Sequence, residues 1–148
     1  MVLTAAHFVL DSFPGMMHTV LPAIQGSFGL SMAAGGVLLT VFLIASNGIQ
    51  VLVGHLRADR DKPLLLYIGL GLACSLLLFW AVPTGGQALF WLAGIALLSG
   101  TGVGMTHPES LKAVHRLEGI PWALSSTVFM GGGIFGFAFG GWASTHLF

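Results

Sequence analysis

Apolar residues along this chain gather into long stretches that are separated by short polar connections. Five stretches can be distinguished, over residues 2–24, 33–54, 64–83, 87–106 and 120–146. Each is close to the length of about 20 residues that an α-helix needs to cross the hydrocarbon core of a bilayer. The pattern predicts an all-α, polytopic membrane protein of about five transmembrane helices, which form a single domain over residues 1–148 with no soluble domain.

The composition agrees with a bilayer as the main surroundings of the chain. Hydrophobic residues make up 55% of the sequence and charged residues 7%, whereas soluble domains carry roughly 25% charged residues. The formal net charge is zero, so no basic surface for nucleic acid is expected. The lone cysteine, Cys74, lies in the third stretch, where a buried thiol is expected.

The basic residues occupy only some of the connections. All of them lie in or beside the second and fourth connections: Arg57, Arg60, Lys62, Lys112 and Arg116. Short loops rich in Lys and Arg stay in the cytoplasm. The sequence therefore predicts an integral membrane protein, with the N-terminus cytoplasmic and the C-terminus outside. The first residues lack the basic segment of a secretory signal and are expected to belong to the mature protein.

Three polar side chains interrupt the first stretch. At 100° per residue, Asp11 and His18 lie within about 40° of His7 on a helix, so the three share one face. A carboxylate inside a membrane is costly and is a functional candidate, here as a proton or cation site on a polar pathway. The alternative is a buried hydrogen bond between Asp11 and His7 that only fixes packing. No metal is expected, because no second ligand pair of this kind accompanies them.

The fifth stretch contains the segment FMGGGIFGFAFGGW, in which glycine recurs at every fourth position. Gly132, Gly136 and Gly140 would form a smooth ridge on a helix. Such ridges allow two membrane helices to approach closely. These glycines are therefore predicted to be a packing surface for another helix.

The segment THPES follows the fourth stretch. Pro108 is expected to end the helix there or to begin a new turn. His107 and Glu109 are expected either to pair with charges of the loops or to cap the helix end.

Four segments together resemble the N-terminal part of a major facilitator superfamily transporter, and within it the fosmidomycin-resistance type of efflux protein. These are HFVLDSFPGMMHTVLP, LSMAAGGVLLTVFLIASNGIQVLVGHLRADR, GVGMTHPESLKA and FMGGGIFGFAFGG, the last similar to the fifth helix of antiporters. The resemblance implies that Gly54, Asp59, Arg60 and Lys62 form the loop that gates the inner face. One extra residue separates Gly54 from Asp59, and Val51, Thr106 and Gly141 also depart from the pattern of the group.

The resemblance predicts a partial, efflux-like transporter for a small molecule in a bacterial inner membrane, with Asp11 as the candidate site for coupling to protons. Full transporters of this kind have two halves of six helices each, so this chain is expected to need a membrane protein partner or self-assembly. The alternative is a transporter-derived subunit that transports nothing and packs within a larger membrane complex. An enzyme is not expected, because no catalytic or phosphate-binding motif has a convincing setting, and no cofactor is implied.

Overall fold

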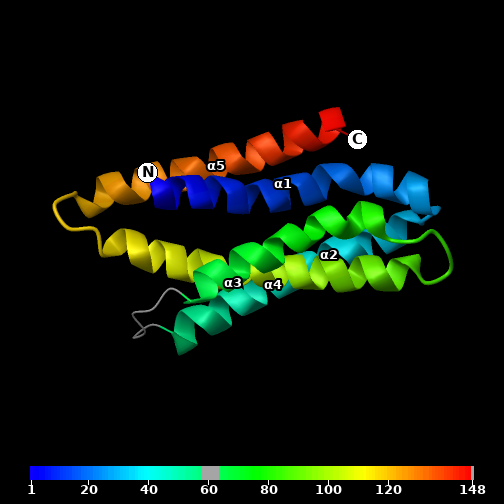
Figure 1. The fold of residues 1–148 in the computed structure, drawn as a ribbon, viewed down its shortest axis with the longest axis horizontal. Coiled ribbons are helices and arrows are strands. Elements are labelled where there is room, and N and C mark those ends of the chain that lie inside the picture. The colour runs from blue at the N-terminus through cyan, green and yellow to red at the C-terminus, as the bar shows by residue number, and fades with distance from the viewer. Residues whose placement is uncertain (58–63, 148) are drawn as a thin grey trace.

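The computed structural model describes residues 1–57 and 64–147, all of whose regular elements are helical. These elements are α1 (Val2–Phe28), α2 (Met32–Leu56), α3 (Leu64–Ala73), the 3₁₀-helix η1 (Cys74–Ala81), α4 (Ala88–His115) and α5 (Trp122–Leu147). Because η1 continues α3 directly, they make five rods that run along the long axis of the molecule (Figure 1). The predicted all-α fold with five helices is confirmed.

Membrane-spanning length and apolarity are shown for four of the five rods. They are α2, the combined α3 and η1 (Leu64–Ala81), α4 and α5. α1 has 27 residues, but polar side chains interrupt its apolar stretch, and it is not among the four. Large apolar side chains point outward from the bundle, as Ile44, Ile134 and Phe135 do with 69%, 69% and 73% exposure. Such an outer surface suits lipid rather than water.

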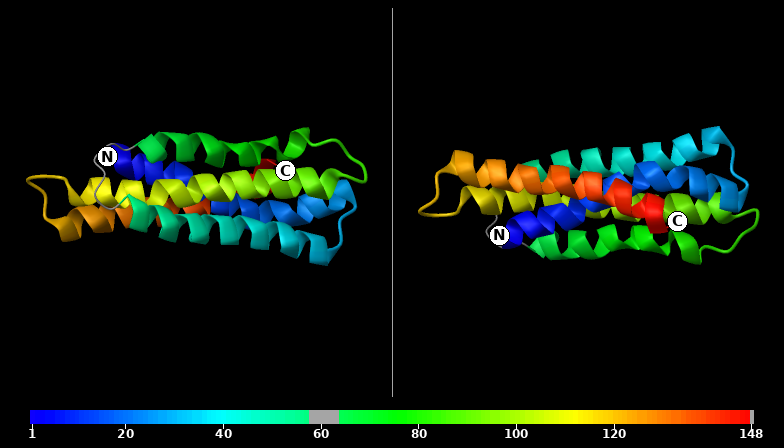
Figure 2. Two further views of the ribbon diagram at one scale, coloured as in Figure 1. Left: turned by 90° about the horizontal axis from the view of Figure 1, so that it is seen from below. Right: turned by 90° about the horizontal axis from the view of Figure 1, so that it is seen from above.

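The rods alternate in direction, so that the second and fourth finish at the same end of the bundle (Figure 1). α1 therefore runs parallel to α5, against which it packs along much of its length, and α2 runs parallel to α4 (Figure 2). α4 contacts every other helix. The interior is filled by large apolar side chains, which include Leu10, Met17, Ile24, Leu38, Phe42, Phe79 and Leu92.

The turn between α1 and α2 follows from local chemistry. Gly29 ends α1 with a left-handed backbone at φ 62°, which glycine adopts without a steric penalty. Ser31 then caps α2, because its hydroxyl accepts a hydrogen bond from the Ala34 amide at 3.2 Å. Two helices joined by so short a turn run in opposite directions, although α1 packs mainly against α5 and α2 mainly against α4.

The fourth helix differs from the prediction, because it does not end near residue 106. α4 continues through Pro108 to His115. A proline inside a membrane helix is tolerated where neighbouring groups satisfy the backbone that it leaves free. The turns after Pro108 consist of residues that favour helix, and the ion pairs of Glu109 described below hold them against α2.

The third rod tightens from α-helix to 3₁₀-helix after Ala73, which the sequence did not predict. At this junction the Ser99 hydroxyl of α4 donates a hydrogen bond to the Ala73 carbonyl at 2.9 Å. A side chain that engages a backbone carbonyl competes with the hydrogen bonds of the helix itself. The expectation of a buried thiol was wrong: Cys74, the first residue of η1, is exposed. The tighter turn of η1 changes which side chains face the core.

Candidate functional site

Three polar side chains from α1 and α4 meet inside the bundle and form what we call the histidine–aspartate cluster: His7, Asp11 and His107. One carboxylate oxygen of Asp11 lies 3.2 Å from His7 Nε2, and the other lies 3.0 Å from His107 Nε2. His7 is 2% exposed, Asp11 18% and His107 22%. A single carboxylate is thus held between two imidazoles from different helices.

Backbone carbonyls fix the orientation of both imidazoles. His7 Nδ1 donates to the Phe129 carbonyl of α5 at 2.9 Å, and His107 Nδ1 donates to the Val103 carbonyl at 2.9 Å. A carbonyl only accepts hydrogen bonds, so both Nδ1 atoms carry a proton. Both Nε2 atoms are left to face the carboxylate, either protonated or with a lone pair. The cluster is therefore arranged to hold positive charge next to Asp11.

α5 closes the cluster from one side. The His7 ring stacks on the Phe129 ring with centroids 4.0 Å apart. Gly133, one turn further along α5, leaves the space that the cluster occupies, because a Cβ there would collide with the Asp11 carboxylate and the His7 ring. Three helices thus shape the site.

A cavity of about 550 Å³ opens beside the cluster. It is lined by His7, Asp11, Asn47, Gln50, Val51, Gly54, His107, Pro108, Leu111, Phe129 and Met130. Asn47 and Gln50 bring amide groups from α2 to this cavity, whose remaining walls are mostly apolar. A small molecule or water in it would reach Asp11 and His107 directly.

The structure does not bring His18 to this site. His18 shares the helix face of Asp11 by angle, yet it lies about two turns further along α1. Its side chain is exposed, and its Nδ1 donates to the Pro14 carbonyl of the same helix at 2.7 Å. The angular position of His18 on α1 therefore did not predict which neighbouring helix lies next to that turn of α1.

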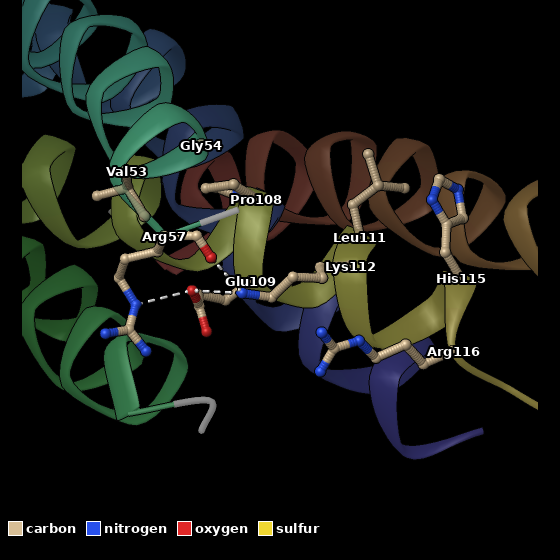
Figure 3. Close-up of a pocket in the computed structure, with 9 residues that line it drawn as sticks. All are labelled: Val53, Gly54, Arg57, Pro108, Glu109, Leu111, Lys112, His115 and Arg116. Carbon is tan, nitrogen blue, oxygen red and sulfur yellow. Dashed lines mark hydrogen bonds and ion pairs between the residues drawn. The ribbon is translucent and has the colours of Figure 1, made fainter. Parts of the chain in front are cut away.

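A second polar cluster lies where α2 ends, and we call it the basic–glutamate cluster: Arg57, Glu109 and Lys112 (Figure 3). Glu109 is 2% exposed, and its Oε1 accepts from Arg57 Nε at 3.0 Å and from Lys112 Nζ at 3.2 Å. Lys112 Nζ also donates to the Arg57 carbonyl at 2.8 Å, at the C-terminus of α2. This cluster ties α2 to α4.

The space around the basic–glutamate cluster is a cavity of about 390 Å³. Of the loop residues expected to gate the inner face, Gly54 lines this cavity, and a Cβ there would lie 3.8 Å from Pro108. Asp59, Arg60 and Lys62 lie outside the residues that the structure describes. Arg57 was not predicted as a site residue, although an arginine at the end of an apolar stretch was a signal for it.

The three glycines of the fifth stretch pack within the chain itself. A Cβ at Gly132 would collide with Thr4, one at Gly136 with the backbone of Phe8, and one at Gly140 with the backbone of Ser12. The ridge is therefore occupied by α1. A surface for a separate partner chain must lie elsewhere on the molecule.

A second glycine surface was missed in the sequence. A Cβ at Gly100 would collide with the Phe42 carbonyl of α2, and one at Gly104 with the Ser46 carbonyl. The spacing of four residues is the same as in α5 and was the available signal. These contacts bring α4, and with it His107 and Glu109, close to α2.

Among known proteins, the chain is similar to the fosmidomycin resistance protein of Escherichia coli (strain K12). The two are 29% identical over 138 residues, which is 93% of this chain and 33% of the relative. The chain thus spans about a third of the length of this relative. The match confirms the resemblance to a fosmidomycin-resistance protein of the major facilitator superfamily as distant homology. No protein-family profile and no solved structure matches the chain.

Proposed function

We propose that the chain is part of a proton-coupled efflux transporter of the major facilitator type, and that a membrane partner or further copies complete the transport unit. The observation that carries this proposal is the Asp11 carboxylate between two imidazoles, beside a cavity. The distant homology to a fosmidomycin resistance protein supports it.

In this proposal Asp11 is the proton site, and its two partners make its charge depend on how the helices lie. His7 is on the same helix as Asp11, whereas His107 is on α4. A movement of α4 relative to α1 would separate His107 from the carboxylate and leave its charge less well paired. Because a carboxylate without a partner is costly inside a membrane, such a movement would favour its protonation. Proton binding and helix movement would thereby be coupled.

The basic–glutamate cluster has the role of a latch in this proposal. It lies at the end of the bundle that the basic connections assign to the cytoplasm. Its ion pairs join the last turn of α2 to α4, and they must loosen if these ends separate. Gly54, Asp59, Arg60 and Lys62 are proposed to extend the latch, as the family resemblance implies.

The test uses vesicles that contain the full chain together with whatever membrane protein copurifies. With fosmidomycin as the probe and an imposed proton gradient, we expect the wild type to drive its transport. Asp11→Asn should abolish this transport, because the amide has the size of the carboxylate but cannot bind and release a proton. Glu118→Gln, a change in the exposed connection between α4 and α5, is the matched control and should transport normally.

Transport at the wild-type rate by Asp11→Asn would remove Asp11 from the mechanism. The same vesicles address the alternative of a transporter-derived subunit that transports nothing. If the wild-type vesicles move neither protons nor the probe, and the chain is recovered as a stoichiometric component of a larger membrane complex, that alternative is correct and the transport proposal is wrong.

A further inference from the structure

The histidine–aspartate cluster has the composition of a metal site, which the sequence alone did not indicate. The Asp11 carboxylate, one nitrogen of His7 and one nitrogen of His107 all lie within 4.8 Å of one another. The sequence showed only the first two, on one helix, and the fold adds a third ligand from α4. We propose that this cluster binds a divalent transition-metal cation of the Zn²⁺ or Co²⁺ type.

The distances suit such an ion. In tetrahedral zinc sites the bonds to nitrogen and oxygen are about 2.0–2.1 Å, which places neighbouring ligand atoms about 3.3 Å apart. The two nitrogen–oxygen distances in the cluster, each to a different oxygen of the Asp11 carboxylate, are 3.2 and 3.0 Å, and the three ligand atoms lie within 4.8 Å of one another. Binding of an ion therefore requires rotations that draw the three side chains together around it.

The outer contacts of the two imidazoles are those of metal ligands. A histidine that binds a metal through one nitrogen usually donates its other N–H to a carbonyl or carboxylate, which fixes the ring. Both rings do this here through Nδ1, His7 to Phe129 and His107 to Val103. Each Nε2 is thereby directed at the place where the ion would lie.

The charges of the carboxylate and of the two imidazole nitrogens also favour a cation between them. When the imidazoles are neutral, two nitrogen lone pairs face the oxygens of one carboxylate, and these contacts repel. Two protons relieve the repulsion, and so does one divalent cation that binds all three groups. Imidazole ligands favour zinc and its neighbours in the first transition series over Mg²⁺ and Ca²⁺, which prefer oxygen ligands.

The adjoining cavity leaves one position of the ion open. Asn47 and Gln50 line the same cavity as the three ligands. Sites with three protein ligands and an open position hold a water molecule or an exchangeable ligand. The ion would therefore exchange with the cavity rather than be sealed in the core.

The experiment is a Co²⁺ titration of the full chain, purified in detergent with a histidine-free tag and stripped of metal by a chelator. We expect one Co²⁺ per chain, with the strong visible absorption of a tetrahedral complex that Zn²⁺ displaces. His107→Gln and Asp11→Asn should each weaken binding at least about tenfold. His115→Gln changes an exposed histidine of the same helix and should leave binding unchanged.

Two results would overturn the proposal. One is a chain that takes up no Co²⁺, in which case the cluster holds protons only. The other is a His107→Gln variant that binds as the wild type does. If His107→Gln fails to fold by circular dichroism, X-ray absorption of the zinc-loaded wild type decides instead, and a first shell without two imidazoles contradicts the site.

This inference concerns the same atoms as the proposed function and does not depend on transport. Metal binding by a chain that is recovered in a larger complex and whose vesicles move neither protons nor the probe would keep the site and remove the transport proposal. Transport without metal binding would do the reverse.

Discussion

Two carboxylates of this chain, Glu109 and Asp11, pair with basic side chains in different surroundings. The residues that α4 contributes to the two clusters, His107 and Glu109, flank Pro108. Glu109, in the basic–glutamate cluster, is 2% exposed and pairs with an arginine and a lysine. Asp11, in the histidine–aspartate cluster, is 18% exposed and pairs with two histidines beside the larger cavity. The partners of Glu109 are a guanidinium and an ammonium group, whereas those of Asp11 are imidazoles, which serve in proteins both as proton carriers and as metal ligands.

The difference indicates that the two clusters along α4 have separate roles. An ion pair with a guanidinium or ammonium group holds two helix ends together and can be broken only by separating them. A carboxylate between imidazoles can instead bind a proton or a metal ion, so the charge of this cluster depends on what it binds. We therefore expect changes to the first cluster to act mainly on stability and changes to the second to act mainly on binding and transport.

The largest effect on stability is expected from Glu109→Gln. The amide cannot balance the charges of Arg57 and Lys112, and breaking a buried ion pair costs about 3 kcal/mol. The free energy of unfolding, measured by titration of mixed micelles with a denaturing detergent, should fall by about this amount. Glu118→Gln, in an exposed connection, should leave it unchanged. Equal losses in the two variants would show that the basic–glutamate cluster does not stabilise the bundle.

The next largest effect on stability is expected from Gly136→Ala, which changes the packing of α5 against α1 beside the histidine–aspartate cluster. The new Cβ collides with the backbone of Phe8, so α1 and α5 must move apart. Overpacking of this kind costs about 2 kcal/mol, to be measured as a lower free energy of unfolding. Gly131→Ala is the matched control, because its Cβ meets nothing within 4 Å. A variant at 136 as stable as the control would mean that the two helices pack less closely than described.

A smaller loss of stability is expected from Asp11→Asn. The amide nitrogen can donate to the Nε2 of a neutral imidazole and the amide oxygen can accept from the Nε2 of a protonated one, so the loss should be about 1 kcal/mol. The same micelle titration, run beside Glu109→Gln, provides the direct comparison of the two carboxylates. A loss as large as that of Glu109→Gln would contradict the separate roles of the two clusters, since Asp11 would then also stabilise the bundle.

The helices were predictable because their signal is local. Each apolar stretch is long enough to be recognised without knowledge of its neighbours, and the positions of the five rods follow from it. The fourth apolar stretch ends at residue 106, and Pro108 was expected either to end the helix or to begin a new turn, whereas α4 runs on to His115. The turns after Pro108 are tied to α2 by the pairing of Glu109 with Arg57, two groups that are distant in the sequence.

The candidate site was predictable in its components and not in its assembly. Asp11 and His7 are four residues apart, so helix geometry alone places them together. His107 joins them only because glycines let α4 and α5 approach their neighbours closely, and this sets which turn of α4 faces α1. The rotation of each helix about its own axis and its shift along that axis depend on the packing of the whole bundle. The same reason explains why His18, expected on the face of Asp11, is exposed and lies away from the site.

The smallest effect on stability, with a large effect on the site, is expected from Gly133→Ala. The new methyl group would collide with the Asp11 carboxylate and the His7 ring, which are the ends of side chains and can move aside. Alanine also favours the helix over glycine by up to about 1 kcal/mol, so the free energy of unfolding should change by less than this.

The displaced carboxylate, however, can no longer face both imidazoles. Co²⁺ binding and proton-driven transport of the probe should both weaken in Gly133→Ala, and neither should weaken in Gly131→Ala, which lies two residues away on α5 with open space around its Cβ. A variant at 133 that binds and transports normally would show that the distances between Asp11 and its two histidines do not control the site. If Gly133→Ala loses as much stability as Glu109→Gln does, the histidine–aspartate cluster also stabilises the bundle. The comparison of the two carboxylates therefore depends most sharply on this one methyl group, because it changes the geometry of the histidine–aspartate cluster and removes none of its ligands.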